Sequence, residues 1–272
     1  MTYQSIRFEV ADGVAVITLD RPEVRNAFNG EMGRELSEAF ATCDRDDRIG
    51  AVVLTGTPPA FCAGADLSAA GDTFGPRPAD AFSAAATTVR AWDVRKLVVA
   101  AVNGHAIGLG LTLALQCDIR IFAADATYGV VQVRRGMMGD AYSHWTLPRT
   151  VGMAAAADIL LTGRTFDGHE ARTLGICNRT LPAEEVVPAA VDLARDVAVN
   201  AAPLSVAASK QLLWESWDRT AAEVEESETQ LHLLLMSKVD AREGVESFLE
   251  KRRPQWRGSV SRDLPTRAPG PD

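Results

Sequence analysis

The spacing of apolar residues changes along the chain and predicts alternating strands and helices. Residues 7–20 alternate apolar and polar positions around Asp12-Gly13, a pair typical of a two-residue hairpin turn. From Met32 to Cys43 the apolar positions recur at helical spacing, which predicts an amphipathic helix. Further strands are expected at 51–56, 96–104, 119–123, 128–133 and around 175–181, and further helices at 82–95, at 108–118, from 140 onward and at 153–163.

Strands that alternate with helices across short turns predict an α/β core built of layers. Residues 57–80 are rich in Pro, Gly and Asp, and an irregular segment of that length indicates a functional loop. Beyond about residue 190 the pattern is helical only: Pro203 suits a first helical turn, and Asp240 is the expected N-cap of a last helix that ends before Pro254. We expect three parts: an α/β core over 1–195, a helical segment over 196–257 and a disordered tail over 258–272.

The composition is that of an ordinary globular protein, with 47% hydrophobic and 24% charged residues. A net charge of -8 disfavours a nucleic-acid partner, because phosphate backbones are held by clustered Lys and Arg. No apolar run is long enough to span a membrane, and no secretory signal is recognised. The four cysteines show no C-x-x-C pairing, so we expect reduced thiols in a cytoplasmic protein and no metal site.

Three stretches, in order along the chain, resemble the enoyl-CoA hydratase/isomerase, or crotonase, superfamily. They are AFCAGADL (60–67), NGHAIGLGLTLALQCDIRI (103–121) and GRTFDGHEARTLGICNRTLP (163–182), and the similarity extends from about Val14 to Pro254. The resemblance implies a crotonase-like spiral of ββα units with a C-terminal helical trimerisation segment, assembled as a homotrimer or a dimer of trimers. It also implies an acyl-CoA thioester as substrate, with coenzyme A as part of that substrate and no permanently bound cofactor. The reaction must be argued from the site, because one fold hosts many reactions.

The device shared by the superfamily is an oxyanion hole, in which two backbone N–H groups face the oxygen of a thioester enolate. The resemblance implies that the donors are the amides of Ala65, after Gly64, and of Leu109, at the start of the short apolar helix. Many relatives have glycine in place of Leu109, but a backbone donor can still serve if the leucine side chain leaves the pocket open. The G-x-G at 108–110 is no dinucleotide fingerprint, because Leu113 stands where the third glycine is required.

For coenzyme A, the resemblance implies that the adenine meets the backbone of one loop, at Ala63, Ala65, Asp66 and Leu67, with Ser68 just beyond. Phosphate groups prefer Arg and Lys. Arg25 is the leading candidate, and Lys251 or Arg252 is a second, contributed by a neighbouring subunit. For each of these basic residues, a solvated surface charge is the alternative interpretation.

Hydratases of the superfamily hold and activate one water molecule with two glutamates, and the corresponding residues here are Thr112 and Gln132. A primary amide does not titrate, and a threonine hydroxyl is far from ionising near neutral pH. Each lost acid–base group costs a factor of about 10² to 10⁴ in rate. Hydration by the usual route is therefore expected to be badly impaired.

Asp140, eight residues after Gln132, is the remaining acid near the expected pocket. Its place matches the proton-shuttling aspartate of dienoyl-CoA isomerases and the nucleophilic aspartate of aromatic acyl-CoA dehalogenases. Asp140 also suits a helix N-cap, and His144, one turn later, would share its face and could form a dyad with it. Arg134 is a weaker candidate, expected at the surface or in a subunit contact.

Two classes of function remain open from the sequence. One is an acyl-CoA enzyme in which the Ala65 and Leu109 amides stabilise an enolate and Asp140 moves a proton. The other is a non-catalytic acyl-CoA binding or carrier protein, suggested by Thr112 and Gln132 at the glutamate positions. The acid at 140 favours the enzyme.

Overall fold

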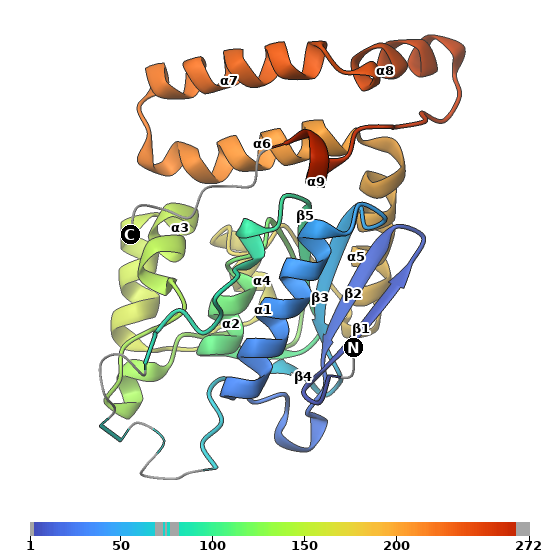
Figure 1. Ribbon diagram of the computed structural model, residues 1–272. Coiled ribbons are helices and arrows are strands. Elements are labelled where there is room, and N and C mark those ends of the chain that lie inside the picture. The colour runs from blue at the N-terminus through green and yellow to red at the C-terminus, as the bar shows by residue number, and fades with distance from the viewer. Residues whose placement is uncertain (1–2, 69–72, 74, 77–81, 265–272) are drawn as a thin grey trace.

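A six-stranded sheet runs through the centre of the molecule (Figure 1). The computed structural model describes residues 3–68, 73, 75–76 and 82–264. The first two strands of the sheet are antiparallel, and every other neighbouring pair is parallel. In spatial order the strands are β1 (Ile6–Ala11), β2 (Val14–Leu19), β3 (Ala51–Gly56), β5 (Leu97–Val102), β7 (Ile119–Ala123) and β9 (Arg179–Leu181).

A second, parallel sheet has three short strands, in the order β4 (Ala60–Cys62), β6 (His105–Ile107) and β8 (Tyr128–Gly129). Along the chain, β3, β5 and β7 of the large sheet are each followed by one strand of the small sheet. Helices α2 (Leu109–Ala114) and α3 (Ser143–Thr162) follow β6 and β8. This succession agrees with the spiral of ββα units that the family resemblance implies.

The elements around the large sheet form for the expected physical reasons. Asp12 and Gly13 both have positive φ, 51° and 78°, as the predicted hairpin turn requires. Helix α1 (Gly30–Arg45) begins after Asn29, whose side chain accepts a hydrogen bond from the Met32 amide at 2.9 Å. Helix α5 (Ala183–Asn200) covers β2, β3, β5, β7 and β9. All of β3 is buried, because parallel strands are covered on both faces.

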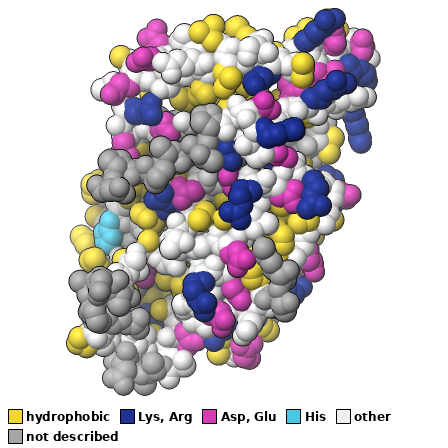
Figure 2. Space-filling model, in the orientation of Figure 1, with side chains coloured by type: hydrophobic (Ala, Val, Ile, Leu, Met, Phe, Trp, Pro, Cys, Tyr) yellow, Lys and Arg dark blue, Asp and Glu magenta, His cyan; other side chains and the backbone are white. Residues whose placement is uncertain are grey.

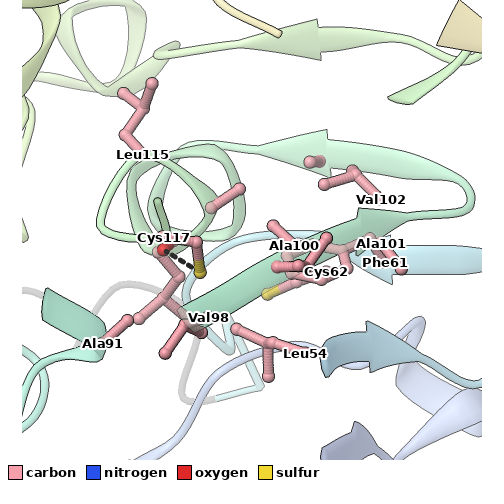
Figure 3. Packing of buried hydrophobic residues seen from close by; sticks show 14 of the residues in the cluster. Leu54, Phe61, Cys62, Ala91, Val98, Ala100, Ala101, Val102, Leu115 and Cys117 are labelled. Atoms are coloured by element: carbon pink, nitrogen blue, oxygen red, sulfur yellow. Dashed lines mark hydrogen bonds between the residues drawn. The ribbon is translucent and has the colours of Figure 1, made fainter. Parts of the chain in front are cut away.

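Helix α2 lies inside the core. All of its residues are buried, which explains why its sequence, LGLTLA, has no polar face. Figure 3 shows Phe61 and Cys62 of β4 near Ala100 and Ala101 of β5, within the same apolar cluster. Just beyond α2, the Cys117 thiol donates to the Leu113 carbonyl. Near the start of α2, Gly110 packs against Cys62 of β4.

The C-terminal helices form a separate layer across one end of the sheet (Figure 1). The Lys210 ammonium is buried and forms an ion pair with Asp118, 2.7 Å from its Oδ2. The Trp214 indole donates to the other oxygen of Asp118 at 2.7 Å. These contacts hold the first helix of the layer on the core. The layer comprises α6 (Pro203–Glu215), α7 (Ala221–Met236), α8 (Val239–Glu250) and α9 (Val260–Asp263).

The last described residues return to the core, although a disordered tail was expected from residue 258. Val260 and Leu264 are buried. The Arg95 guanidinium donates to the carbonyls of both, each at 3.1 Å. Asp47, just after α1, accepts hydrogen bonds from the Ser259 and Ser261 hydroxyls. The expectation is wrong up to residue 264, and residues 265–272 lie outside the described part.

The predicted helix over 82–95 is also wrong. Among the described residues of this segment there are turns and one short 3₁₀ helix, η4 (Ala91–Asp93). Ala86 has a φ of 69°, which interrupts a right-handed helix. The Thr88 amide donates to the Ser37 hydroxyl at 3.0 Å, and the Ala84 carbonyl accepts from the Ala141 amide at 2.8 Å. Backbone N–H and C=O groups that would pair with each other in a helix therefore form hydrogen bonds with neighbouring elements.

Several elements begin or end at residues other than those predicted. The strand expected around 175–181 is confined to β9 and follows α4 (Gly168–Thr173), and the core boundary expected after residue 195 falls inside α5. Lys238 occupies the N-cap position of α8, so the prediction that Asp240 is the N-cap is wrong. The Asp240 carboxylate instead accepts hydrogen bonds from the amides of Arg257 and Gly258, at 2.8 and 2.9 Å.

Basic and acidic side chains are interspersed over the face of the molecule shown in Figure 2. Charged side chains of the described residues form ion pairs, such as Arg48 with Asp46 at 2.7 Å. Within the described residues, no helix combines the length and apolar character needed to cross a membrane.

Candidate active site

A small cavity of about 60 Å³ lies beyond the carboxyl ends of β4, β6 and β8. Because these three strands are parallel, the loops that follow them meet at one edge of the small sheet, where α/β proteins commonly bind ligands. The lining residues come from the ends of the strands and the segments that follow them: Ala63, Gly64, Ala65 and Leu67 after β4; Ile107 at the end of β6, with Gly108 and Leu109 after it; and Val131, Gln132, Arg135, Met137 and Asp140 after β8.

Gly64 allows the first two loops to approach closely. Its φ of +96° favours glycine. A Cβ atom at this position would lie 2.8 Å from the Ile107 carbonyl oxygen, closer than real Cβ contacts, and 3.9 Å from the Leu109 nitrogen. The backbone after β4 therefore lies directly against the start of α2.

The amides of Ala65 and Leu109 both border this cavity. Ala65 forms an isolated parallel bridge with Phe28, in which Gly64 supplies the acceptor and Asp66 the donor. Neither the Ala65 nor the Leu109 N–H has a hydrogen-bond acceptor among the residues that the structure describes. The Leu109 side chain is 7% exposed and belongs to the hydrophobic core. Two unused backbone donors thus lie at one cavity.

The Asp140 carboxyl lies between Thr112 and Gln132, the two residues at the predicted glutamate positions. Its Oδ1 accepts a hydrogen bond from Gln132 Nε2 at 3.1 Å and lies 3.5 Å from the Thr112 hydroxyl. The same hydroxyl donates to the Leu109 carbonyl at 3.1 Å. Both side-chain donors meet Oδ1, and no side chain of the described residues donates to Oδ2.

Burial raises the pKa of the Asp140 carboxyl above its ordinary value. Hydrogen bonds from its own backbone N–H, Thr112 and Gln132, and the attraction of His144, oppose this effect without cancelling it. A raised pKa makes the carboxylate a stronger base than a solvated aspartate. Such a shift in a cavity is typical of a group that moves protons.

Asp140 is not a helix cap, which corrects one of the interpretations of the sequence. Helix α3 begins at Ser143, its N-cap is Tyr142, and no side chain caps it. Ala141 and Tyr142 both have positive φ, 44° and 65°. The Gln116 side chain donates to the Ala141 carbonyl at 3.3 Å. These two left-handed residues separate Asp140 from the helix, and its side chain is turned toward Thr112.

His144 does not pair with Asp140. The imidazole is exposed, and its Nδ1 lies 3.3 Å from the Ser143 hydroxyl. Within the described part of the chain, the side-chain partners of the Asp140 carboxyl are Thr112 and Gln132. The dyad is therefore not formed in the structure, although His144 contributes a weak electrostatic attraction.

Gln132 is buried, with 9% of its surface exposed. The oxygen and the nitrogen of its side-chain amide differ in their surroundings. Nε2 donates to Asp140, whereas Oε1 is buried without a hydrogen-bond partner among the described residues. The side chain covers Gly108, where a Cβ atom would lie 3.2 Å from Nε2. Gly108 thus provides the space in which Gln132 reaches Asp140.

Arg135 is a cavity residue that the sequence analysis missed. The predicted strand over 128–133 ends at Gly129, and Gln132–Arg135 form a 3₁₀ helix, η5. In a strand, Gln132 would share a face with Arg134; in a 3₁₀ helix it shares one with the residue three positions later. Arg134 instead donates to the Thr162 carbonyl at 2.8 Å and does not line the cavity. The exposed side chain of Arg134 agrees with the expected surface position, whereas Arg135 was not considered from the sequence.

The loop expected to hold adenine lies beside Arg25. The Ala63 amide donates to the Arg25 carbonyl at 3.0 Å, and the Arg25 side chain is exposed. Asp66 accepts from the Ser68 amide at 2.9 Å and forms an ion pair with Arg21 at 2.9 Å. Arg21, which the sequence analysis did not consider, thus helps to fix this loop. The Ser68 amide and Arg21 hold the pKa of Asp66 below its ordinary value.

Lys251, the second phosphate candidate, is distant from the cavity of its own chain. It follows the last residue of α8, which lies at the opposite end of the molecule from β4 and α2 (Figure 1). Its side chain is exposed. Any contact of Lys251 with a ligand in this type of cavity would have to come from another copy of the chain.

Comparisons with known proteins agree over nearly the whole chain. The sequence model of the family described as enoyl-CoA hydratase/isomerase matches residues 9–259. The crystal structure of a probable enoyl-CoA hydratase/isomerase from Mycobacterium abscessus is 48% identical with a TM-score of 0.91, covering 93% of this chain and 99% of that one. The probable enoyl-CoA hydratase echA8 of Mycobacterium tuberculosis is 36% identical over 262 residues, 94% of this chain and 99% of that protein.

Another relative is named for a different activity. The carnitinyl-CoA dehydratase of Proteus mirabilis is 32% identical over 260 residues, which cover 94% of this chain and 99% of that protein. The family match, the identities and the structural agreement all extend over more than nine-tenths of the chain. The chain belongs to the enoyl-CoA hydratase/isomerase family of acyl-CoA-processing enzymes and has the crotonase fold.

Proposed function

We propose that this protein moves a proton between carbon atoms of an enoyl-CoA thioester, as an isomerase does, and that Asp140 carries the proton. The observation behind the proposal is the position of the Asp140 carboxyl between Thr112 and Gln132 in the cavity. Among the described residues that line this cavity, Asp140 is the one with an acidic side chain.

The free amides of Ala65 and Leu109 are the proposed oxyanion hole. When a proton leaves the carbon next to the thioester, its electron pair moves onto the carbonyl oxygen and makes an enolate. Two fixed N–H donors stabilise that negative charge without reorganisation, and loss of one such donor costs a factor of about 10² to 10³ in rate. The close contact at Gly64 supports this role, because it brings the backbone of the two loops together.

Asp140 can both take and return the proton. Its Oδ1 is held by Gln132, so Oδ2 is the proposed atom that accepts a proton from one carbon and delivers it to another. The reaction needs no second acid or base, because the carboxylate ends in the state in which it began. Its raised pKa favours acceptance, and its partial burial excludes competing water.

Hydration makes a different demand on the site. Water must lose a proton to a base while the neighbouring carbon gains one, and hydratases of the superfamily use two carboxylates for these tasks. Here the corresponding side chains are an amide and a hydroxyl, both buried. We therefore expect water addition to be slower than proton exchange.

Coenzyme A is the proposed common part of the substrates. The backbone of Ala63, Ala65, Asp66 and Leu67, with Ser68, would receive the adenine, and Arg25 would meet a phosphate. The hydrogen bond between Ala63 and the Arg25 carbonyl supports this placement. Lys251 would join from another subunit of the proposed homotrimer or hexamer.

The test uses deuterated water and matched 2-enoyl-, 3-enoyl- and dienoyl-CoA esters. Deuterium incorporation and double-bond position are followed by NMR and mass spectrometry. We expect exchange and isomerisation in the wild type, and a loss of about 10²- to 10⁴-fold in Asp140→Asn with binding of the ester retained. The control is Asp125→Asn, at an exposed position in the turn after β7.

Each other outcome contradicts the proposal in a specific way. Ester binding without exchange in the wild type would identify a carrier. Water addition faster than exchange would identify a hydratase, and an acyl or aryl adduct on Asp140 would identify a covalent nucleophile. Equal loss of exchange in Asp125→Asn and Asp140→Asn would remove the specific role of Asp140.

A further inference from the structure

Arg135 contributes a cationic side chain to the cavity, and proton transfer at Asp140 makes no use of it. We propose that Arg135 selects acyl-CoA substrates whose acyl chain ends in a carboxylate. The substrate class would then be the mono-CoA thioesters of dicarboxylic acids. This inference rests on the proposed function, because it concerns the acyl group that occupies the same cavity.

The direction of Arg135 follows from the 3₁₀ helix η5. Side chains three residues apart eclipse in a 3₁₀ helix, so Arg135 projects from the same side as Gln132. A rise of about 2.0 Å per residue separates the two positions by about 6 Å along the helix axis. Gly136, with a φ of 75°, ends the helix directly after Arg135. Arg135 thus lies one helical turn beyond the reacting groups.

The surroundings of Arg135 match an apolar chain with an anionic end. Val131, Met137 and Leu67 line the same cavity, and they suit methylene groups. Arg135 is exposed, and no carboxylate lies within 4.0 Å of its guanidinium in the described part of the chain, whereas Arg21, nearby in the loop before α1, is paired with Asp66. A guanidinium binds a carboxylate through two parallel hydrogen bonds, which a methyl end cannot replace.

Arg134 provides a matched control. It is the neighbour of Arg135 in the same 3₁₀ helix and has the same charge, but its side chain donates to the Thr162 carbonyl outside the cavity. Substitution of either arginine by glutamine changes the net charge equally. A difference between the two variants therefore reports position and not overall charge.

The experiment measures dissociation constants by calorimetry for the full chain with adipyl-CoA and hexanoyl-CoA, and with suberyl-CoA and octanoyl-CoA. We expect the wild type to bind the carboxylate-ended ester about fivefold more tightly than its length-matched partner, as a partly exposed ion pair allows. The preference should decrease at high salt. Arg135→Gln should abolish it, Arg135→Lys should reduce it and Arg134→Gln should retain it.

Equal affinities of the wild type for both esters would overturn the inference. It would also be overturned if Arg135→Gln weakened both esters equally, because Arg135 would then contact the coenzyme A part. Asp140→Asn separates this inference from the proposed function: it should lose exchange and keep the preference for the carboxylate. A wild type with that preference but without exchange would contradict the proposed reaction alone.

Discussion

At the scale of single residues, burial and hydrogen bonding act on the Asp140 carboxyl in opposite directions. Burial raises its pKa and is the larger effect, while Thr112 and Gln132 favour the charged form. The protonated form is therefore stabilised by folding relative to a solvated aspartate. In such a group, a stabilising contribution is present at low pH and is lost as the pH rises through the raised pKa.

Because the pKa of Asp140 is raised, we predict that Asp140→Asn stabilises the fold near neutral pH. Asparagine keeps an oxygen that can accept from Gln132 but carries no charge to bury. The melting temperature of the variant should exceed that of the wild type at pH 7, and the difference should disappear below pH 4. Thermal unfolding across this range is the measurement. A lower melting temperature at pH 7 would show that the ionised carboxylate stabilises the fold, as a cap does.

Gln132→Glu should shift the pH dependence of proton exchange upward. The new carboxylate would replace an amide nitrogen that lies 3.1 Å from Asp140 Oδ1. Two carboxylates at that separation share a proton, which raises one pKa of the pair strongly. In the wild type, exchange should fall as the pH decreases through the pKa of Asp140, and in the variant this fall should begin at higher pH. An unchanged profile would mean that the two side chains do not interact in solution.

At the scale of elements, the turns beyond the small sheet determine the geometry of the site. Gly64 and Gly108 both have positive φ, 96° and 54°, and each lies against another loop of the cavity. Gly64 contacts the segment before α2, and Gly108 contacts Gln132. The position of the two free amides therefore depends on loops in which a Cβ atom would not fit.

Gly64→Ala should separate these loops and impair catalysis. The added Cβ would lie 2.8 Å from the Ile107 carbonyl, so the Ala65 amide must move. We expect a decrease of about 10² to 10³ in kcat for exchange, the effect of losing one oxyanion donor. Gly175→Ala is the control, because Gly175 also has positive φ, 81°, but its nearest neighbour would be 4.0 Å away. An equal loss of activity in both variants would attribute the effect to general instability.

The sequence predicted those elements whose period is set by the core. The hairpin around Asp12, the strand 51–56 and the buried helix after Gly108 are confirmed, because their apolar residues face layers on defined sides. The helix predicted over 82–95 is wrong because backbone groups of this segment pair with distant residues. The strand predicted over 128–133 is too long because the chain from Gln132 follows the period of a 3₁₀ helix. No local pattern shows that Ser37 accepts from the Thr88 amide.

Part of the candidate site could be predicted from the sequence, and part of it could not. The sequence identified the loops of Ala65 and Leu109 through their resemblance to a family, and the structure brings them to one cavity. The contact of Asp140 with Thr112 and Gln132 could not be predicted, because it depends on two left-handed residues after Asp140. The cavity position of Arg135 depends on η5, which the apolar pattern of 128–133 concealed.

At the scale of the whole molecule, the C-terminal layer carries large apolar side chains at its surface. Phe248 and Leu249 of α8 are 81% and 72% exposed, and Val245 is 59% exposed. Hydrophobic side chains are also visible among polar ones along the edge of the molecule formed by α7 (Figures 1 and 2). Clustered apolar residues at a surface are typical of a protein interface.

We expect these residues to be covered in a homotrimer or a dimer of trimers. Phe248→Asp would place a charge in that interface, so it should shift the molecular mass toward that of the 29.1 kDa chain. Light scattering coupled to gel filtration measures the change. Glu250→Gln is a control at the end of the same helix. A wild type that elutes as a monomer would contradict the prediction.

The helical layer is fastened to the core at two places far apart in the sequence. Lys210 holds its first helix on Asp118 and on the carbonyls of Ala91 and Lys96. Arg95 donates to the carbonyls of the first residue of α9 and of the residue that follows this helix. Both attachments converge on the residues that lead into β5, the strand that continues to β6 and α2. Contacts of the proposed oligomer with this layer would therefore act on one short stretch of chain, which continues through β5 and β6 to the Leu109 amide. We therefore expect association with a second subunit to affect the alignment of the proposed oxyanion donors.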